Sequence, residues 1–214
     1  DRSVPPGRRV ASLWFTYGGK NRQVLEKLVT RFNASQGEHW VRAVFQGDYF
    51  EGLAKLRTAA AARAGPSVSH VIGEVIPYLS EAGVLEPLDG YPGARELGIV
   101  PTLGQEKSWI GGGERPLVAL PFNRSTPIAY LNGEIFGKSG LPAPKTWQEL
   151  RDVARALTVR EGDRIVRHGF GCPIDWWFWV ALVGQAGGQV VEPDGTVSLG
   201  GDAGVEALEL WQTL

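Results

Sequence analysis

The sequence predicts an α/β fold made of two lobes, with parallel-rich sheets flanked by helices. Two observations carry the prediction. Near the amino terminus three strand-like segments each precede a helical segment, and the composition shifts near residues 120–127. Strands that alternate with helices favour a parallel sheet covered on both faces. We therefore expect a first α/β lobe over residues 1–121, and a hinge crossing with a second, incomplete α/β lobe over residues 122–214.

The first lobe opens with the run from Val10 to Tyr17, which is apolar and rich in aromatic residues, as buried strands are. Gly18 and Gly19 then turn the chain. From Asn21 onward apolar residues recur at helical spacing, which predicts an amphipathic helix packed by one face. Strand, glycine turn and helix form the first half of a βαβ unit.

Two more strand and helix pairs follow. The segment Trp40–Phe45 predicts a second strand, and the alanine-rich helix after it should begin near an Asp48 cap and end at Gly65. The segment Val68–Ile72 predicts a third strand, followed by a short helical piece that ends at Gly83. These pairs complete the pattern expected of a parallel sheet.

The crossing between the lobes is predicted at a polar stretch. Two strand-like runs, Leu117–Pro121 and Pro127–Leu131, enclose the polar residues 123–126. Proline lacks an N–H and suits strand ends, so regular pairing should stop here. We interpret this stretch as the hinge, with its polar centre on the floor of a cleft. Arg124 either faces solvent or supplies positive charge to an anionic solute.

The second lobe is predicted to hold several helices and strands. The sequence indicates a helix over residues 133–139, a helix capped by Thr146, a strand near Gly169, an aromatic helix from Asp175, a strand pair over residues 189–199 and a terminal helix. The terminal helix runs to Leu214 without a glycine cap or a proline stop. We expect the chain to be cut there, so that a carboxyl-terminal part is missing.

Composition excludes several classes of function. The chain has 22 basic and 23 acidic residues, which gives no electrostatic reason to expect nucleic acid as a partner. Its single cysteine, Cys172, allows no internal disulfide and no all-cysteine zinc site. No apolar run approaches the roughly 20 residues that span a bilayer. Residue 1 is not a methionine, and we expect that any signal peptide has already been removed.

No catalytic or cofactor motif is present. The sequence lacks G-x-S-x-G, H-E-x-x-H, a P-loop and C-x-x-C. The glycines at 111–113 precede no helix and predict a flexible loop. His39, His70 and His168 lie far apart in sequence, and we expect solvated or hydrogen-bonded histidines rather than a metal site. We predict no catalytic residue, cofactor or metal, and retain a hydrolase that pairs Glu74 with another carboxylate only as a minor alternative.

Three polar residues follow the three predicted strands of the first lobe. They are Tyr17, Tyr49 and Glu74. In an open α/β sheet, ligands bind at the carboxyl ends of the strands, where helix starts converge. All three side chains can form hydrogen bonds with a polar ligand, so together they predict a binding site at that edge.

The densest aromatic cluster lies at residues 175–179, "DWWFW". On a helix, Trp176 and Trp179 share one face while Trp177 points elsewhere. One face can pack on the core of the second lobe, and another can present a flat indole to a cleft. We expect at least two of the four aromatic rings to pack in the core, and interpret Trp176 and Trp177 as candidates for stacking on a ligand.

Longer motifs resemble a known family. The stretches "LPFNRSTPIAYLN" at 120–132, "GEIFGKSGLPAPKTWQELRDVARALT" at 133–158 and "FQGDYFEGLAKLRTA" at 45–59 resemble the extracytoplasmic solute-binding proteins of ABC importers. The resemblance runs from about Val10 to Leu214, and is strongest to members that bind glycerol phosphates. It implies a type II, periplasmic-binding-protein-like fold, in which two lobes close over one solute. It also implies an extracytoplasmic location, in the periplasm or as a lipoprotein on the cell surface.

The resemblance also implies site residues and partners. Tyr49, Glu74, Ser125 and Trp176 stand where the glycerol-phosphate binders have ligand contacts, and Trp177 can replace a second cleft tryptophan that has no clean counterpart. The implied function is capture of sn-glycerol-3-phosphate or a glycerophosphodiester for uptake, with a di- or oligosaccharide as the alternative. The implied partners are the small-molecule solute and the membrane permease subunits of the importer. We expect a monomer and no enzymatic activity.

Overall fold

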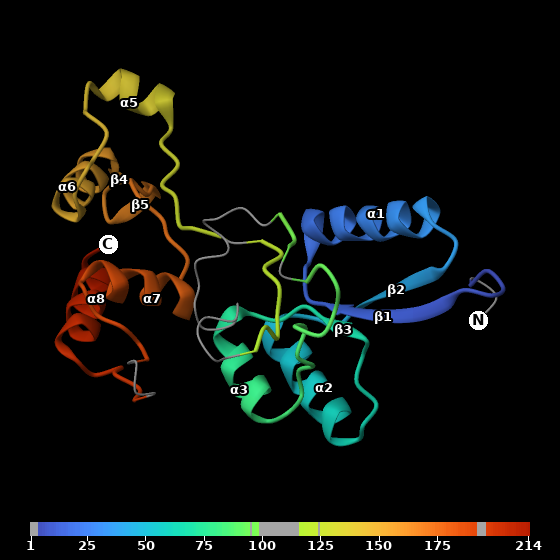
Figure 1. Cartoon of the computed structure of the whole chain (residues 1–214). Coiled ribbons are helices and arrows are strands. Elements are labelled where there is room, and N and C mark those ends of the chain that lie inside the picture. The colour runs from blue at the N-terminus through green and yellow to red at the C-terminus, as the bar shows by residue number, and fades with distance from the viewer. Residues whose placement is uncertain (1–3, 95, 99–115, 124, 192–195) are drawn as a thin grey trace. The chain divides into compact units, whose positions relative to one another are not determined.

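The computed structural model describes residues 4–94, 96–98, 116–123, 125–191 and 196–214 (Figure 1). The chain divides into two compact units: unit 1 is Asp1–Arg124 and unit 2 is Ser125–Leu214. The composition shift predicts a boundary between residues 121 and 122, close to this division. That the two units act as lobes of one closing protein stays a prediction.

Unit 1 contains a parallel sheet of three strands, β1 (Arg9–Phe15), β2 (His39–Phe45) and β3 (Val68–Ser69), in the order β2-β1-β3. Helix α1 (Gly19–Ser35) covers one face, and α2 (Tyr49–Ala61) lies on the other (Figure 1). This is the predicted strand and helix alternation. The third strand is shorter than predicted, because only Leu13 and Trp14 of β1 pair with it.

Capping hydrogen bonds and a close glycine contact determine the position of α2 in unit 1. Asp48 accepts hydrogen bonds from the backbone N–H groups of Phe50 and Glu51, and the Glu51 carboxylate accepts from the N–H of Asp48, which confirms the predicted cap of α2. Gly52 lets α2 approach β1 closely, since a Cβ atom there would lie 2.5 Å from the Thr16 methyl carbon. After β3 the chain forms a single 3-10 turn, η1 (Gly73–Val75), and the helix α3 (Ile76–Glu81).

Unit 2 is mainly helical around a small hydrophobic core. Its elements are α5 (Gly133–Ser139), α6 (Trp147–Leu157), β4 (Val159–Glu161), β5 (Arg164–Arg167), α7 (Trp176–Gln185) and α8 (Asp202–Thr213). The buried core consists of Phe178, Leu182 and Val183 of α7 with Ala207 of α8. Thr146 accepts the N–H of Glu149 and so caps α6, as predicted, and Gly140 ends α5 in the left-handed conformation.

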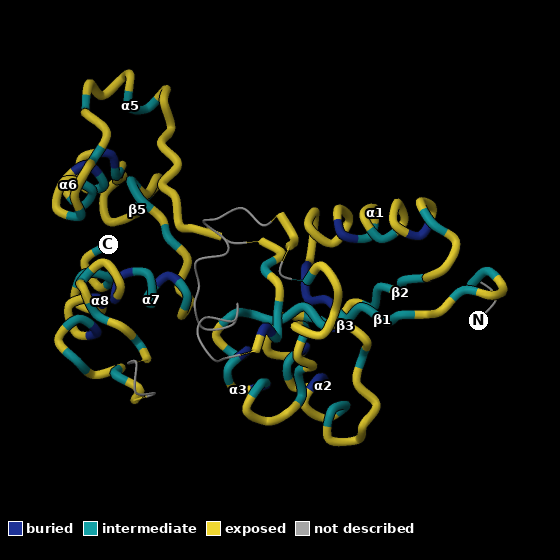
Figure 2. Tube along the Cα trace, viewed as in Figure 1, coloured by how far each residue is buried: buried dark blue, intermediate teal, exposed yellow. Residues whose placement is uncertain are grey.

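Several predicted strands are wrong. Neither 117–121 nor 127–131 forms a strand. The N–H of Leu117 instead donates to the Asp89 carboxylate, its carbonyl accepts from Leu88, and residues 125–134 are exposed throughout (Figure 2). The strand near Gly169 is half of an antiparallel hairpin, β4 with β5, whose first strand the sequence did not reveal. Among the described residues of 189–199, Val191 and Val197 form an isolated antiparallel bridge in place of the predicted strand pair.

Two further findings concern the chain as described. None of the helices in the described ranges is both long and apolar enough to cross a membrane. Arg124 and the glycines at 111–113 lie outside the described residues, so the predictions made for them are not addressed by the structure.

Candidate functional site

The carboxyl edge of the sheet in unit 1 carries a cluster of polar aromatic side chains. Tyr17 follows β1, Tyr49 is the first residue of α2, and His70 directly follows β3. The imidazole of His70 packs against both phenol rings, with its ring centroid 4.2 Å from that of Tyr17 and 5.6 Å from that of Tyr49. We call these three residues the edge cluster. The βα junctions therefore converge as the parallel topology predicts.

Tyr17 is the buried member of the edge cluster, with 8% of its surface exposed. Its hydroxyl donates a short hydrogen bond to the side-chain carbonyl of Asn123, and the Phe122 ring packs 6.1 Å away. Burial, together with the nearby Tyr49, raises the pKa of Tyr17 from 10.0 to about 12, although the bond to Asn123 opposes the shift. Tyr17 therefore ties the polar stretch at residues 122 and 123 to the end of β1.

Tyr49 is the open member of the edge cluster, with 40% of its surface exposed. The Asp48 cap fixes the start of α2 and so places Tyr49 at the rim of the sheet. Burial raises the pKa of Tyr49, and the negative charge of Glu74 raises it further. The negative charge of Glu74, on the turn that follows β3, thus acts on the Tyr49 phenol at the same edge of the sheet.

His70 belongs to the edge cluster, although the sequence predicted for it no more than a solvated or hydrogen-bonded histidine. Its Nδ1 atom lies 3.0 Å from the Thr16 hydroxyl, and burial lowers the pKa of the imidazole. The signal that could have found it is its position, because it follows a strand of the parallel sheet as Tyr17 and Tyr49 do. The described residues hold no group of three or more side chains suited to a metal ion.

In unit 2 the predicted site residues lie on an exposed segment and on α7. Ser125 is exposed. Trp176 is the first residue of α7, behind the cap formed by Asp175, and 41% of its surface is exposed, while Trp177 is half-buried. The structure thus leaves Trp176 accessible to a ligand, as stacking requires.

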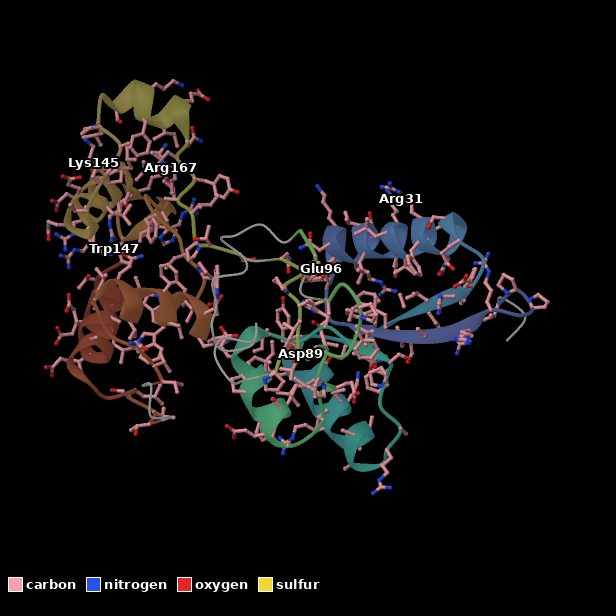
Figure 3. The ribbon with its side chains drawn as sticks, in the orientation of Figure 1. Arg31, Asp89, Glu96, Lys145, Trp147 and Arg167 are labelled. Carbon is pink, nitrogen blue, oxygen red and sulfur yellow. The ribbon has the colours of Figure 1, made fainter. Side chains whose placement is uncertain are left out.

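The other two aromatic rings of α7 serve the core of unit 2. Phe178 is buried, and Trp179 packs against the same core. The indole N–H of Trp147 on α6 donates to the side chain of Gln185 on α7 at 2.9 Å and holds the two helices together (Figure 3). The expectation that at least two of the four rings pack in the core is therefore confirmed. Of the predicted site residues, unit 1 holds Tyr17, Tyr49 and Glu74, and unit 2 holds Ser125, Trp176 and Trp177.

The edge cluster can bind hydroxyl groups. Phenol and imidazole groups both donate and accept hydrogen bonds, and the Glu74 carboxylate accepts them. An ionised carboxylate repels a phosphate group, so this edge suits the hydroxyl-bearing part of a solute.

Comparison with known proteins gives the family context. Residues 18–214 match the model of the family described as bacterial extracellular solute-binding protein. The sn-glycerol-3-phosphate-binding periplasmic proteins UgpB of Agrobacterium fabrum and of Escherichia coli strain K12 are each 30% identical over 158 residues, which cover 67% of this chain and 34% of theirs. The chain thus spans about a third of the length of these curated relatives.

Solved structures show the same fold. "CpMnBP1 with Mannotriose Bound" has a TM-score of 0.73 and 21% identity, over 96% of this chain and 52% of that one. The GacH receptor of Streptomyces glaucescens has a TM-score of 0.71 and 21% identity, over 94% and 51%. The matches confirm the family and the type II fold class predicted from the sequence. They also confirm the extracytoplasmic location, since the family is extracellular.

Proposed function

The chain belongs to the bacterial extracellular solute-binding protein family, and we propose that it captures a small hydroxylated solute for an ABC importer. The observation that carries this proposal is the edge cluster with Glu74. It gathers hydrogen-bonding groups at the carboxyl ends of three parallel strands, where open α/β sheets bind their ligands. On this proposal the protein is not an enzyme. It acts as a monomer that delivers its solute to membrane permease subunits.

For the solute we propose sn-glycerol-3-phosphate or a glycerophosphodiester. The support is the name shared by relatives at 30% identity, together with the ability of Tyr49 and Glu74 to bind the glycerol hydroxyls. The phosphate would then face away from Glu74. The second candidate is a di- or oligosaccharide, favoured by the same carboxylate because a sugar presents hydroxyls and no charge.

We further propose that the two units are lobes that close over the solute, so that bound solute stabilises the closed state. In this proposal Trp176 and Trp177 stack on the solute, and Ser125 donates a hydrogen bond near the hinge. The exposure of Trp176 and Ser125 supports these roles.

The test is a titration of the protein at its natural length. Glycerol-3-phosphate, glycerophosphocholine and maltose are each added while tryptophan fluorescence and binding heat are recorded. We expect saturable binding of the glycerol compounds. Binding of maltose alone would replace the first solute by the second, and the absence of binding by all three would contradict the proposed function as stated.

Two substitutions locate the site. Glu74→Gln and Tyr49→Phe each remove one polar function and keep the shape of the side chain. Each should weaken solute binding about tenfold, which corresponds to the roughly 1.4 kcal/mol of a lost hydrogen bond. The matched controls are Glu209→Gln and Tyr78→Phe, which alter exposed residues elsewhere. Equal changes in solute affinity in the variants and the controls would mean that the solute does not bind at this edge of the sheet.

A further inference from the structure

We propose that His70 is a positioning residue of the solute site, which holds Tyr17 and Tyr49 in place as a neutral imidazole and weakens solute binding when it is protonated. The inference rests on the proposed function, because it assumes that the edge cluster contacts the solute. It assigns a role to a residue that the sequence pattern left without one, and it states which part of the solute faces unit 1.

The first step is geometric. His70 is the common neighbour of two site residues that belong to different elements, since Tyr17 follows β1 and Tyr49 begins α2. Its ring packs against both phenols, and its Nδ1 atom is held by Thr16 at 3.0 Å. The ring therefore sets the spacing between the tyrosines. Removing the His70 ring would let Tyr17 and Tyr49 change rotamer, and the site would lose its preorganisation.

The second step concerns the proton. In neutral imidazole one nitrogen donates and the other accepts, and the Thr16 hydroxyl can complement either arrangement. In the protonated ring both nitrogens donate, and among the described residues only Thr16 forms a hydrogen bond with the ring. The titratable groups that face His70 are Tyr17, which follows β1, and Tyr49 of α2, and the charge of Glu74 on η1 acts on Tyr49. Burial lowers its pKa below 6.5, so the ring is neutral at neutral pH.

The third step is the direction in which solute affinity changes with pH. A solute seated on the edge cluster removes more water from His70, which disfavours the charged ring still further. The solute therefore binds the neutral form better, and affinity should fall as the pH drops through the pKa of His70. A phosphate group against His70 would reverse this sign, since an anion favours the imidazolium. A fall in affinity at acidic pH thus means that the hydroxyl-bearing part of the solute faces His70.

The test compares wild type, His70→Phe and His70→Gln by titration with glycerol-3-phosphate from about pH 5 to about pH 8, a range that brackets the ordinary histidine pKa. His70→Phe keeps a ring and cannot titrate, and His70→Gln keeps a group able to bond Thr16 but has no ring. The ratio of wild-type to variant affinity cancels the titration of the phosphate itself. The control is His39→Phe, at an exposed histidine of the same unit.

We expect His70→Gln to weaken binding about tenfold at neutral pH, as loss of a preorganised contact does, and His70→Phe to weaken it less. The wild-type affinity relative to His70→Phe should fall by about threefold or more toward pH 5, as histidine protonation requires. A ratio that is flat or rises toward acid would overturn the proposal, as would a pH-independent loss of the same size in both variants.

A second readout works without any solute. Nuclear magnetic resonance follows the ring signals of Tyr17 and Tyr49 against pH in the free protein. In the wild type both sets should shift with the titration of His70, and in His70→Gln they should stay constant through that range. If no tested solute binds, the proposed function fails while this measurement still decides the role of His70. Tyrosine signals that ignore the imidazole would overturn it.

Discussion

Tyr49 in unit 1 and Trp176 in unit 2 occupy the same local position in different surroundings. Each is the first residue of a helix, directly after an aspartate that caps it, and each has about two fifths of its surface exposed. The Asp48 side chain accepts hydrogen bonds from two backbone N–H groups, and the Glu51 side chain accepts one from the N–H of Asp48. The Asp175 side chain accepts only from the N–H of Phe178. Local sequence thus presents an aromatic ring at a helix start in both units.

The neighbours make the difference. The Tyr49 ring packs against His70, and the charge of Glu74 raises the pKa of the Tyr49 phenol. Both of these neighbours belong to the segment that follows β3. Trp176 is exposed at the start of a helix whose residues Phe178 and Leu182 are buried in the core of unit 2. The comparison teaches that a helix start fixes where a ring stands, while the adjacent strands decide whether it joins a polar cluster.

The largest effect on stability should come from replacing a core ring of α7, in contrast to an exposed ring of the same helix. Phe178→Ala should lower the free energy of unfolding by about 3 to 5 kcal/mol, because the ring is buried against Trp211 and the rest of the unit 2 core. Trp176→Ala should change it by only about 0.5 kcal/mol. Urea unfolding followed by circular dichroism measures both. Equal losses would mean that Trp176 is a core residue.

The next largest loss of stability should come from removing the aspartates that cap α2 and α7. Asp48→Ala should cost about 1 to 2 kcal/mol of stability and Asp175→Ala about 0.5 to 1, since only Asp48 forms the reciprocal pair with Glu51. Glu209→Ala, at an exposed position on α8, is the control. The same urea experiment applies, and a reversed order would mean that the capping box adds nothing.

A smaller contrast is expected between the two tyrosines of the edge cluster. Tyr17→Phe should cost about 0.5 to 1.5 kcal/mol, because it removes the hydrogen bond to Asn123, whereas Tyr49→Phe should cost about 0.5 kcal/mol or less. Solute binding should respond in the opposite order, with Tyr49→Phe the more damaging. If Tyr17→Phe proves neutral in unfolding, the bond to Asn123 does not anchor the polar stretch.

A further effect should be a loss of stability in alkali. The native pKa of Tyr17 is about 12 against an ordinary value of 10.0, so the native state holds this proton more tightly than the unfolded state does. The resulting stabilisation is complete below pH 10 and is lost as the pH rises toward 12. Urea midpoints across this range should fall faster in the wild type than in Tyr17→Phe. Parallel curves would assign the alkaline loss to other groups.

Much of unit 1 was predictable because its signals are local. The Asp48 cap, the alternation of strands and helices, and the polar residues after each strand are visible in the sequence, and parallel pairing brings the strand ends to one edge. The hairpin of β4 and β5 was missed because its strands are short and mostly exposed, so no apolar run marks them. The runs 117–121 and 127–131 were mistaken for strands, since apolar character alone does not supply a pairing partner.

The sequence by itself determined the family, the α/β class and the positions of the rings at the helix starts, because these depend on motif, periodicity and capping within a few residues. Only the tertiary structure decided which side chains meet. It packed His70 against both Tyr17 and Tyr49, and bound the Tyr17 hydroxyl to Asn123 across 106 positions of the chain. Such contacts depend on strand order and close packing, which join residues that are remote in sequence.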